Sequence, residues 1–346
     1  MRIRMRPRTL LILCICFLLA IVIYITSSSS EPLIQQANHS HISVSWYTKL
    51  YDPPYHSGFI YETFSYLLPL SRLMQEIGWD AGIQVSQAFR NEFVRDLSGK
   101  DNIILRSLLL KETKRRVESD TSKFISVVFE QPRYYPQIFT NTSQKHSVYK
   151  IGRAMFETTW IPFPWKSDIN TYLDELWVPS SFAREVFKAA GVTVPILVIH
   201  QGFKSEEFVD LLSPENLLET RKRLFPECEE EDLVFFSVGG FQQRKGHDIL
   251  LDVFTRLPRT AAACLYLRTS DYHDTVEYRH FERKVTEYQK SGHRVFLSQH
   301  LPREELVLAH KSADVFILLS HGEGWGRPIM ESMAAAVPAI VPFWSG

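Results

Sequence analysis

The sequence predicts an α/β protein with two Rossmann-like domains, each built on a doubly wound parallel sheet. Three observations predict this class. Short apolar runs of strand length alternate with longer segments of helical periodicity. Glycine-rich loops follow two of these runs and lead into helices, as at the phosphate-binding turns of such sheets. With 346 residues, 45% hydrophobic content and 23 Phe, the chain can bury two cores of ordinary size.

The first half opens with an alternating strand at residues 42–46. A turn-rich stretch that ends at Gly58 follows, and then a helical pattern runs through about Ile77. Ser180 and Gly191 bracket another predicted helix, as its N-cap and as the first residue beyond its C-cap. Further strands are expected at residues 103–105, 124–129, 175–178 and 196–199.

The second half repeats the alternation of strand and helix. Strands are expected at residues 233–238, 265–268, 294–297, 315–319 and 339–341. Helices are expected up to about residue 223, after residue 246, at about 275–289, at 302–311 and from Pro328 onward. In the last of these, Met330, Met333, Ala334 and Val337 have the spacing of a core-facing stripe.

Charge and cysteine content exclude several classes of function. The formal net charge is zero, so the chain lacks the basic excess of a nucleic-acid-binding protein. Two of its 4 cysteines lie in the N-terminal apolar run, which leaves Cys228 and Cys264. These are too few and too scattered to predict a disulfide framework or a zinc site, and Cys264 is interpreted as a buried strand residue.

The N-terminus predicts a membrane anchor. Four arginines precede an uninterrupted apolar run from Leu10 to Ile25. The sequence thus predicts a cytosolic tail at residues 1–9, a transmembrane signal anchor at 10–26 and a stem at 27–41. A cleavable signal peptide is the alternative.

Under either interpretation of the N-terminus, the rest of the chain is translocated across the membrane. We therefore expect a single-pass type II protein of the Golgi or endoplasmic reticulum membrane, with its main part in the lumen. Asn38 and Asn141 begin glycosylation sequons that fit this topology.

A glycine loop near the C-terminus is the strongest functional signal. Gly322, Gly324 and Gly326 interleave with Glu323, Trp325 and Arg327, so the backbone can approach a ligand closely before a helix begins. Free N–H groups and the positive helix end attract an anion such as phosphate. Glu323 and Glu331 are poor phosphate ligands but suit the hydroxyls of a sugar. The loop therefore predicts a nucleotide-sugar site.

A second turn supplies positive charge. The strand at 233–238 meets Gly239 and Gly240, and Arg244 and Lys245 then precede a helix. Basic side chains and backbone N–H groups would converge there on a diphosphate. A solvated basic helix start is the alternative interpretation. No Asp-x-Asp pair occurs in the sequence, so a metal-dependent diphosphate site has no candidate, and no metal or other cofactor is expected.

The stretch from Glu323 to Ala334 resembles the Glu-x7-Glu signature of retaining glycosyltransferases of family 4, which have the GT-B fold of two domains facing a cleft. The resemblance implies that Glu323 orients the donor sugar and Glu331 the ribose. It also implies that Arg244 and Lys245 hold the departing diphosphate, with Gly324, Gly326, Gly239 and Gly240 close to the donor.

This sequence departs from the family pattern at several positions. The family usually has glycine at the position of Ala336. It often has arginine at the position of Gly240. The histidine that many members place beside the reacting sugar has no counterpart, and Glu157 is a candidate for that neighbourhood. Gly58 is a candidate for the acceptor side. The alternative for Gly58 is a plain turn, and the alternative for Glu157 is an ordinary carboxylate without a catalytic role.

The resemblance implies a retaining transferase that moves a sugar from a UDP- or GDP-linked donor to a hydroxyl acceptor. Its acceptor domain would be residues 42–200 and its nucleotide-sugar domain residues 201–346. The family continues with further helices and strands beyond this point, so the second domain is expected to be incomplete. The alternatives are a catalytically impaired truncated isoform, a non-catalytic sugar-nucleotide-binding protein and, less favoured because of the anchor, a sugar-nucleotide epimerase.

Overall fold

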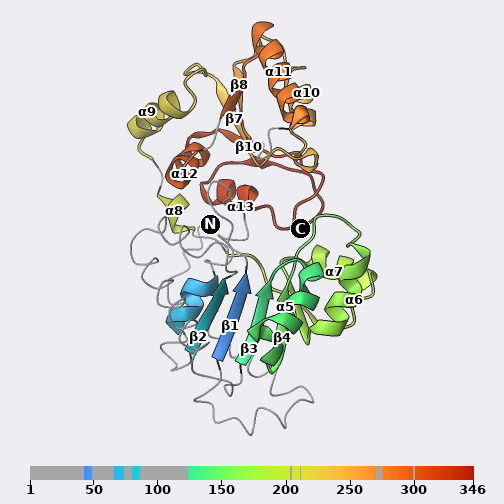
Figure 1. Ribbon diagram of the computed structural model, residues 1–346. Coiled ribbons are helices and arrows are strands. Elements are labelled where there is room, and N and C mark those ends of the chain that lie inside the picture. The colour runs from blue at the N-terminus through green and yellow to red at the C-terminus, as the bar shows by residue number, and fades with distance from the viewer. Residues whose placement is uncertain are drawn as a thin grey trace. The chain divides into compact units, whose positions relative to one another are not determined.

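The structure is a computed structural model of the chain (Figure 1). It describes residues 43–48, 66–73, 80–85, 124–202, 205–210, 212–269, 275–298 and 301–346. These residues fall into two compact units, the first within Met1–Ala154 and Ser167–Leu176 and the second within Met155–Lys166 and Trp177–Gly346. The segment Met155–Lys166 therefore belongs to the second unit, although part of the first unit follows it in the chain.

The first sheet has the strand order β2-β1-β3-β4-β5-β6. Its strands are β1 (Ser43–Thr48), β2 (Asp80–Val85), β3 (Phe124–Phe129), β4 (Tyr149–Arg153), β5 (Glu175–Val178) and β6 (Ile196–Val198). β1 pairs in parallel with β2 and β3, and β3 pairs in parallel with β4. The sequence does not predict β4, because its Tyr-Lys-Ile-Gly-Arg segment is no apolar run. β2 is likewise not predicted, and the strand expected at 103–105 lies outside the described residues.

The helices that accompany these strands include one segment at residues 66–73. The others are η4 (Pro132–Tyr134), α5 (Tyr135–Asn141), η5 (Ser143–His146), α6 (Phe163–Tyr172) and α7 (Ser181–Ala189). Both predicted caps of α7 are confirmed. The Ser180 hydroxyl accepts a hydrogen bond from the Ala183 amide at 3.1 Å, and Gly191 has a φ of 90° just beyond the helix end.

The second sheet has the strand order β11-β10-β7-β8-β9, and all its pairs are parallel. Its strands are β7 (Leu233–Val238), β8 (Ala263–Arg268), β9 (Val295–Ser298), β10 (Val315–Ile317) and β11 (Ala339–Ile340). The helices are α8 (Glu206–Val209), α9 (Pro214–Leu224), η6 (Gln243–Lys245), α10 (His247–Phe254), α11 (Val276–Lys290), α12 (Arg303–Ser312) and α13 (Arg327–Ala334). The strands expected between residues 233 and 341 are thus all present.

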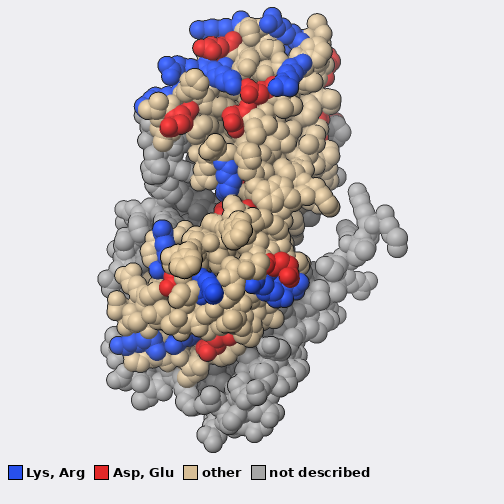
Figure 2. All heavy atoms as spheres, turned by 90° about the vertical axis from the view of Figure 1, so that its right-hand side faces the viewer, with Lys and Arg blue, Asp and Glu red and all other residues tan. Residues whose placement is uncertain are grey.

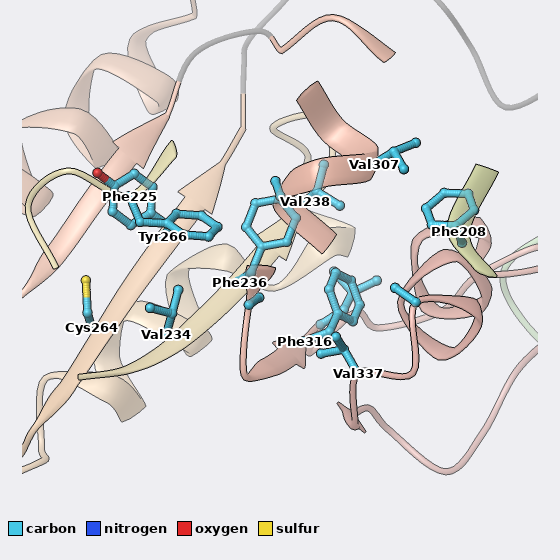
Figure 3. Packing of buried hydrophobic residues seen from close by; sticks show 14 residues of the cluster. Phe208, Phe225, Val234, Phe236, Val238, Cys264, Tyr266, Val307, Phe316 and Val337 are labelled. Atoms are coloured by element: carbon cyan, nitrogen blue, oxygen red, sulfur yellow. The ribbon is translucent and has the colours of Figure 1, made fainter. Parts of the chain in front are cut away.

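Both faces of this sheet are buried, which explains why its strands are nearly continuous apolar runs. One face carries Phe236, Tyr266 and Phe316, and helices α12 and α13 pack against it (Figure 3). The opposite face carries Leu265 and Ile317, which pack against α10 and α11. Figure 1 shows these two helix layers on either side of the sheet.

The predicted stripe of α13 is wrong at Met333, whose side chain is 61% exposed. The helix instead turns Glu331 and Ala335 toward the interior of the unit, where both are buried. Hydrophobic spacing alone favoured the methionine face. The burial of Glu331 depends on cationic partners that include Arg303 of α12, which a helical period cannot reveal.

A disulfide bond joins Cys228, in the loop after α9, to Cys264 on β8. This corrects the expectation drawn from the scattered cysteines, although Cys264 is fully buried on its strand as expected. The two residues are 36 positions apart in sequence, so only the packing of α9 on the sheet brings them together.

The N-terminal predictions concern residues that the structure does not describe. Residues 10–26, Asn38 and Gly58 all lie outside the described ranges. Within those ranges, no helix is both long and apolar enough to cross a membrane. Asn141 is described, and it is the exposed last residue of α5.

Helix α13 ends in a turn that favours glycine but contains alanine. Ala336 has a φ of 61°. Its N–H donates to the Met333 carbonyl at 3.1 Å, and the Val337 N–H donates to the Ser332 carbonyl at 3.0 Å, which is the Schellman pattern. Gly292 takes the same position at the end of α11, with a φ of 88°. The departure at Ala336 therefore stores backbone strain.

We expect Ala336→Gly to stabilise the second unit by about 1 kcal/mol. Glycine removes the left-handed strain, and the greater freedom of the unfolded chain offsets only part of that gain. The measurement is the urea concentration at the midpoint of unfolding. Gly292→Ala is the matched control and should lower the midpoint, because it introduces the same left-handed strain at φ 88°. Its added Cβ would meet nothing closer than Arg259 Cδ at 3.8 Å, so a steric clash would not contribute. A lower midpoint for Ala336→Gly would contradict this account.

Candidate functional site

The two predicted donor motifs lie at the same edge of the second sheet. β10 pairs in parallel with β7, so the carboxyl ends of both strands point the same way. The turn that contains Gly239 and Gly240 follows β7, and the loop that contains Glu323 and Gly324 follows β10. The carboxyl edge of an open parallel sheet is where such folds bind ligands. The structure therefore joins two motifs that are about eighty residues apart.

Opposite charges meet where these loops converge. Lys245 Nζ lies 2.7 Å from Glu323 Oε1, and Arg244 Nη1 lies 3.3 Å from the same oxygen. Arg244 also donates a hydrogen bond to the Gly322 carbonyl. Its Nη2 lies 3.5 Å from Glu157 Oε1. We call Glu157, Arg244, Lys245 and Glu323 the four-charge cluster; it brings all three predicted catalytic residues together.

Lys245 is the most deeply buried cation of this cluster. Burial lowers its pKa, Glu323 opposes that effect, and Arg244 lowers the pKa further. The net shift is downward, so the ammonium is less stable here than in water. An incoming anion would stabilise the charged form.

Two glycines shape the loops around the cluster. Gly246 has a φ of 65°, and a side chain there would meet the Leu319 carbonyl, so the turn after Lys245 packs directly on the chain that leads to Glu323. Gly326, with a φ of 73°, is the N-cap of α13. Gly239 and Gly240 are partly buried after β7, and Gly324 is buried against Met155.

Glu157 enters the site through the segment Met155–Lys166. Its carbonyl accepts a hydrogen bond from Ser345 Oγ at 3.3 Å, and Ser345 Oγ also accepts from the Glu323 N–H at 3.0 Å. Glu157, a candidate from the sequence, thus joins the cluster through Arg244, a contact that the sequence pattern did not predict. Ser345 fixes the backbone of Glu323, and no motif signalled its role.

A pocket of about 360 Å³ adjoins Glu323. Trp325, Ile329 and Met330 line one part of it and residues 341–346 another. Trp325 stacks on His200 with ring centroids 5.3 Å apart. The pocket thus combines aromatic and aliphatic walls with a carboxylate, as ligand sites commonly do.

Glu331 is buried one turn into α13 and is held by two arginines. Arg303 Nη1 lies 2.8 Å from Glu331 Oε1, and Arg327 Nη2 lies 3.4 Å from the same oxygen. Burial raises the pKa of Glu331, but Arg303, His310 and Arg327 together bring it below its usual value. Glu331 is therefore ionised near neutral pH and can accept hydrogen bonds from hydroxyl groups.

His310 lies beside Glu331 in an apolar environment. Its Nε2 is 3.7 Å from Glu331 Oε2, and its ring contacts Phe236 and Phe316. Neither ring nitrogen has a hydrogen-bond partner among the described residues. Burial is the main cause that lowers the pKa of His310 to about 4. The sequence singled out neither Arg303 nor His310, because both lie outside the glycine motifs.

One group of metal-ligating side chains occurs in the described part of the chain. It consists of Cys228, Asp232 and Cys264. The two sulfur atoms are joined in the disulfide, and Arg294 pairs with Asp232 at 2.5 Å. The sulfur atoms are bonded to each other and the carboxylate is paired with Arg294, so this group does not have the character of a metal site.

Residues 220–342 match the sequence model of the family described as glycosyl transferases group 1. A relative called uncharacterized glycosyltransferase 335, of Sulfolobus islandicus rod-shaped virus 1, is 27% identical over 199 residues, which are 55% of each chain. The mannosylfructose-phosphate synthase of Agrobacterium fabrum is 27% identical over 132 residues, 37% of this chain and 29% of that protein. The chain spans about half or less of the length of these curated relatives.

A solved structure described as Anabaena HepE in complex with UDP and glucose shares the fold. Its TM-score is 0.63 at 14% identity, and the match covers 88% of this chain and 82% of the other. A likeness at this identity is evidence of fold alone. It confirms the expected α/β GT-B architecture with two parallel sheets.

The buried histidines predict how stability depends on pH. His247 and His310 both have a pKa of about 4 in the folded chain, against 6.5 for an ordinary histidine, and burial is the main cause in each case. Between these values the unfolded chain binds protons that the folded chain does not. The free energy of unfolding should therefore fall as pH drops from 6.5 to 4, by up to about 3 kcal/mol for each histidine.

Urea titrations at pH 7, 6, 5 and 4.5 measure this dependence. His310→Leu should weaken it, since one of the two buried imidazoles is gone. His280→Leu, at an exposed position of α11, is the matched control and should keep the full dependence. Equal slopes in the wild type and in His310→Leu would argue against the assignment.

Proposed function

We propose that this chain, whose residues 220–342 match the model of the glycosyl transferases group 1 family and whose fold is GT-B, moves a sugar from a nucleotide-sugar donor to a hydroxyl acceptor with retention of configuration. The observation that carries the proposal is the four-charge cluster at the carboxyl edge of the second sheet. It brings two cations against the carboxylate that begins the Glu-x7-Glu pattern. This is the arrangement expected of a retaining transferase of family 4.

In the proposed reaction, the donor diphosphate replaces Glu323 as the partner of Arg244 and Lys245. Glu323 is then free to accept hydrogen bonds from hydroxyls of the transferred sugar. The bond between the anomeric carbon and the diphosphate oxygen breaks, and the acceptor oxygen bonds to that carbon on the same face. The acceptor proton passes to the leaving diphosphate, so no separate base from the protein is needed.

Cationic side chains would stabilise the leaving group without a metal ion. The Lys245 side chain is 12% exposed and that of Arg244 is 26% exposed, so both cations are partly shielded from water and act strongly on the charge that develops on the diphosphate. Glu331 would bind the ribose, as the ionised carboxylate described above. HepE is described as a complex with UDP and glucose, and we propose a UDP- or GDP-linked sugar as the donor of this chain.

Replacing residues of the cluster should strongly reduce the rate of transfer. We expect Lys245→Met and Glu323→Gln each to lower kcat by at least ~100-fold, because preorganised charge at a leaving group contributes about that much. The assay uses the full-length chain with a panel of UDP- and GDP-sugars and measures nucleotide release. Lys284→Met is the matched control, since Lys284 pairs with Asp252 on the partly exposed side of α10 and α11.

Unchanged turnover in both cluster variants would refute the assigned roles. Calorimetry with the same donors separates the second candidate function, a non-catalytic sugar-nucleotide-binding protein. That protein would bind donor in the wild type and release no nucleotide under any condition of the panel.

We further propose that the described part of the chain lies in the lumen of the secretory pathway, anchored by residues 10–26 as a type II membrane protein. Two features support this. The Cys228–Cys264 disulfide suits an oxidising compartment. Asn141 is exposed at the end of α5, where a glycosylation enzyme could reach its sequon.

Asn141 should therefore carry a glycan when the full-length chain is expressed in cells with a secretory pathway. Glycosidase treatment should increase the mobility of the protein on a gel, and Asn141→Gln should reduce that shift by the contribution of one glycan. Asn216, which is followed by Leu217 and Leu218, begins no sequon and provides the control Asn216→Gln, with an unaltered shift. An unglycosylated Asn141 in a domain that cytosolic protease digests would overturn the luminal proposal.

A further inference from the structure

The two oxygens of the Glu331 carboxylate have different environments. Oε1 accepts from Arg303 Nη1 at 2.8 Å and from Arg327 Nη2 at 3.4 Å. Among the described residues, the interaction recorded for Oε2 is the 3.7 Å approach of His310 Nε2, which is beyond hydrogen-bond range. One oxygen is thus fixed by guanidinium groups, while no hydrogen bond to the other is found among the described residues.

Arg303 is itself held from three sides. Its Nε and Nη2 both lie 2.9 Å from Glu207 Oε2 on α8. Its guanidinium lies over the ring of Phe208, 5.2 Å from the centroid. The remaining nitrogen, Nη1, is the one that reaches Glu331. A planar fork fixed in this way can orient a carboxylate, whereas an ammonium group would hold it only as a point charge.

The position of Arg303 in its helix is unfavourable for a cation. Arg303 is the first residue of α12, at the positive end of the helix dipole. Glu304 and Glu305 follow it and have the charge that this end favours. An arginine that contradicts a local preference and is nevertheless mostly buried indicates a role beyond the helix itself.

We propose that Arg303 is a positioning residue for the nucleotide. It holds Glu331 so that Oε2 faces the ribose hydroxyls, and Glu207 and Phe208 keep it in place. The inference rests on the proposed function, in which Glu331 binds the ribose. It goes beyond that function by assigning to Arg303 the preference for ribonucleotides over deoxyribonucleotides.

The expected energies follow from the hydrogen bond to an ionised carboxylate. Such a bond contributes about 1.5–3 kcal/mol, so the wild type should prefer a ribonucleoside diphosphate to its deoxy analogue by about 10- to 100-fold. Arg303→Lys keeps the positive charge but loses the fork, so this preference should fall to within about threefold of equality. The affinity for the deoxy analogue should change far less, because it lacks the hydroxyl that Glu331 binds.

The experiment measures calorimetric affinities of the full-length protein for UDP and GDP and for their 2′-deoxy and 3′-deoxy analogues. The variants are Arg303→Lys and Glu207→Gln, the second of which loosens Arg303 without removing it and should give an intermediate preference. Arg223→Met is the matched control. Arg223 of α9 pairs at 2.5 Å with Glu305, which lies in the same turn of α12 as Arg303. Loss of Arg223 therefore disturbs the start of α12 but not the contacts of Glu331.

The outcomes distinguish this inference from the proposed function. If the wild type discriminates against a deoxy analogue and both folded variants retain the full preference, Arg303 has no positioning role. If the wild type binds the ribo and deoxy forms equally, the ribose assignment of Glu331 fails and the inference with it. If the wild type binds no nucleoside diphosphate, the proposed function itself is wrong. If Arg303→Lys does not fold, the ribonucleotide preference of Glu207→Gln alone decides whether Arg303 has a positioning role.

Discussion

The parallel pairing of β7 with β10 is the constraint on which the candidate site depends. It sets the turn after β7 and the loop after β10 at one edge of the sheet, so that Lys245 and Glu323 meet at 2.7 Å. Both strands are buried on both faces, which fixes their order and register through packing on two helix layers. The charges are thus held by a rigid frame. A site built on strand ends in this way keeps its geometry while its loops adapt to a ligand.

The site contains two carboxylates that the protein neutralises in different ways. Glu323 faces Lys245 and Arg244, which are the natural partners of an anionic ligand. Glu331 faces Arg303 and Arg327, of which Arg303 is also tied to Glu207. Breaking a buried ion pair is costly unless another charge takes its place. In the proposed reaction a diphosphate replaces Glu323 on its cations, whereas Glu331 keeps its arginines and accepts hydrogen bonds from uncharged hydroxyls.

Several predictions from local pattern hold and others fail for one recurring reason. Caps, glycine turns and apolar strands are decided within a few residues, and so Ser180, Gly191 and the strand at 233–238 are found where the sequence places them. The stripe of α13 fails at Met333, because the burial of Glu331 outweighs the hydrophobic period of its helix there. The strand β4 is missed because its polar sequence gives no signal of its pairing with β3, and the disulfide because its cysteines are far apart. Each failure involves a partner from elsewhere in the chain.

The sequence by itself determined the α/β class, the strand-glycine-helix units of the second sheet and the residues of the Glu-x7-Glu pattern. These follow from periodicity, from glycine where the backbone must turn, and from the chemistry of neighbouring side chains. Only the tertiary structure decided which charges pair. The chain has 39 acidic and 39 basic residues, so the composition allows many pairings. The strand order and the helix packing select Glu157 for Arg244 and Arg303 for Glu331, because only the folded chain brings such distant residues within hydrogen-bonding or ion-pair distance.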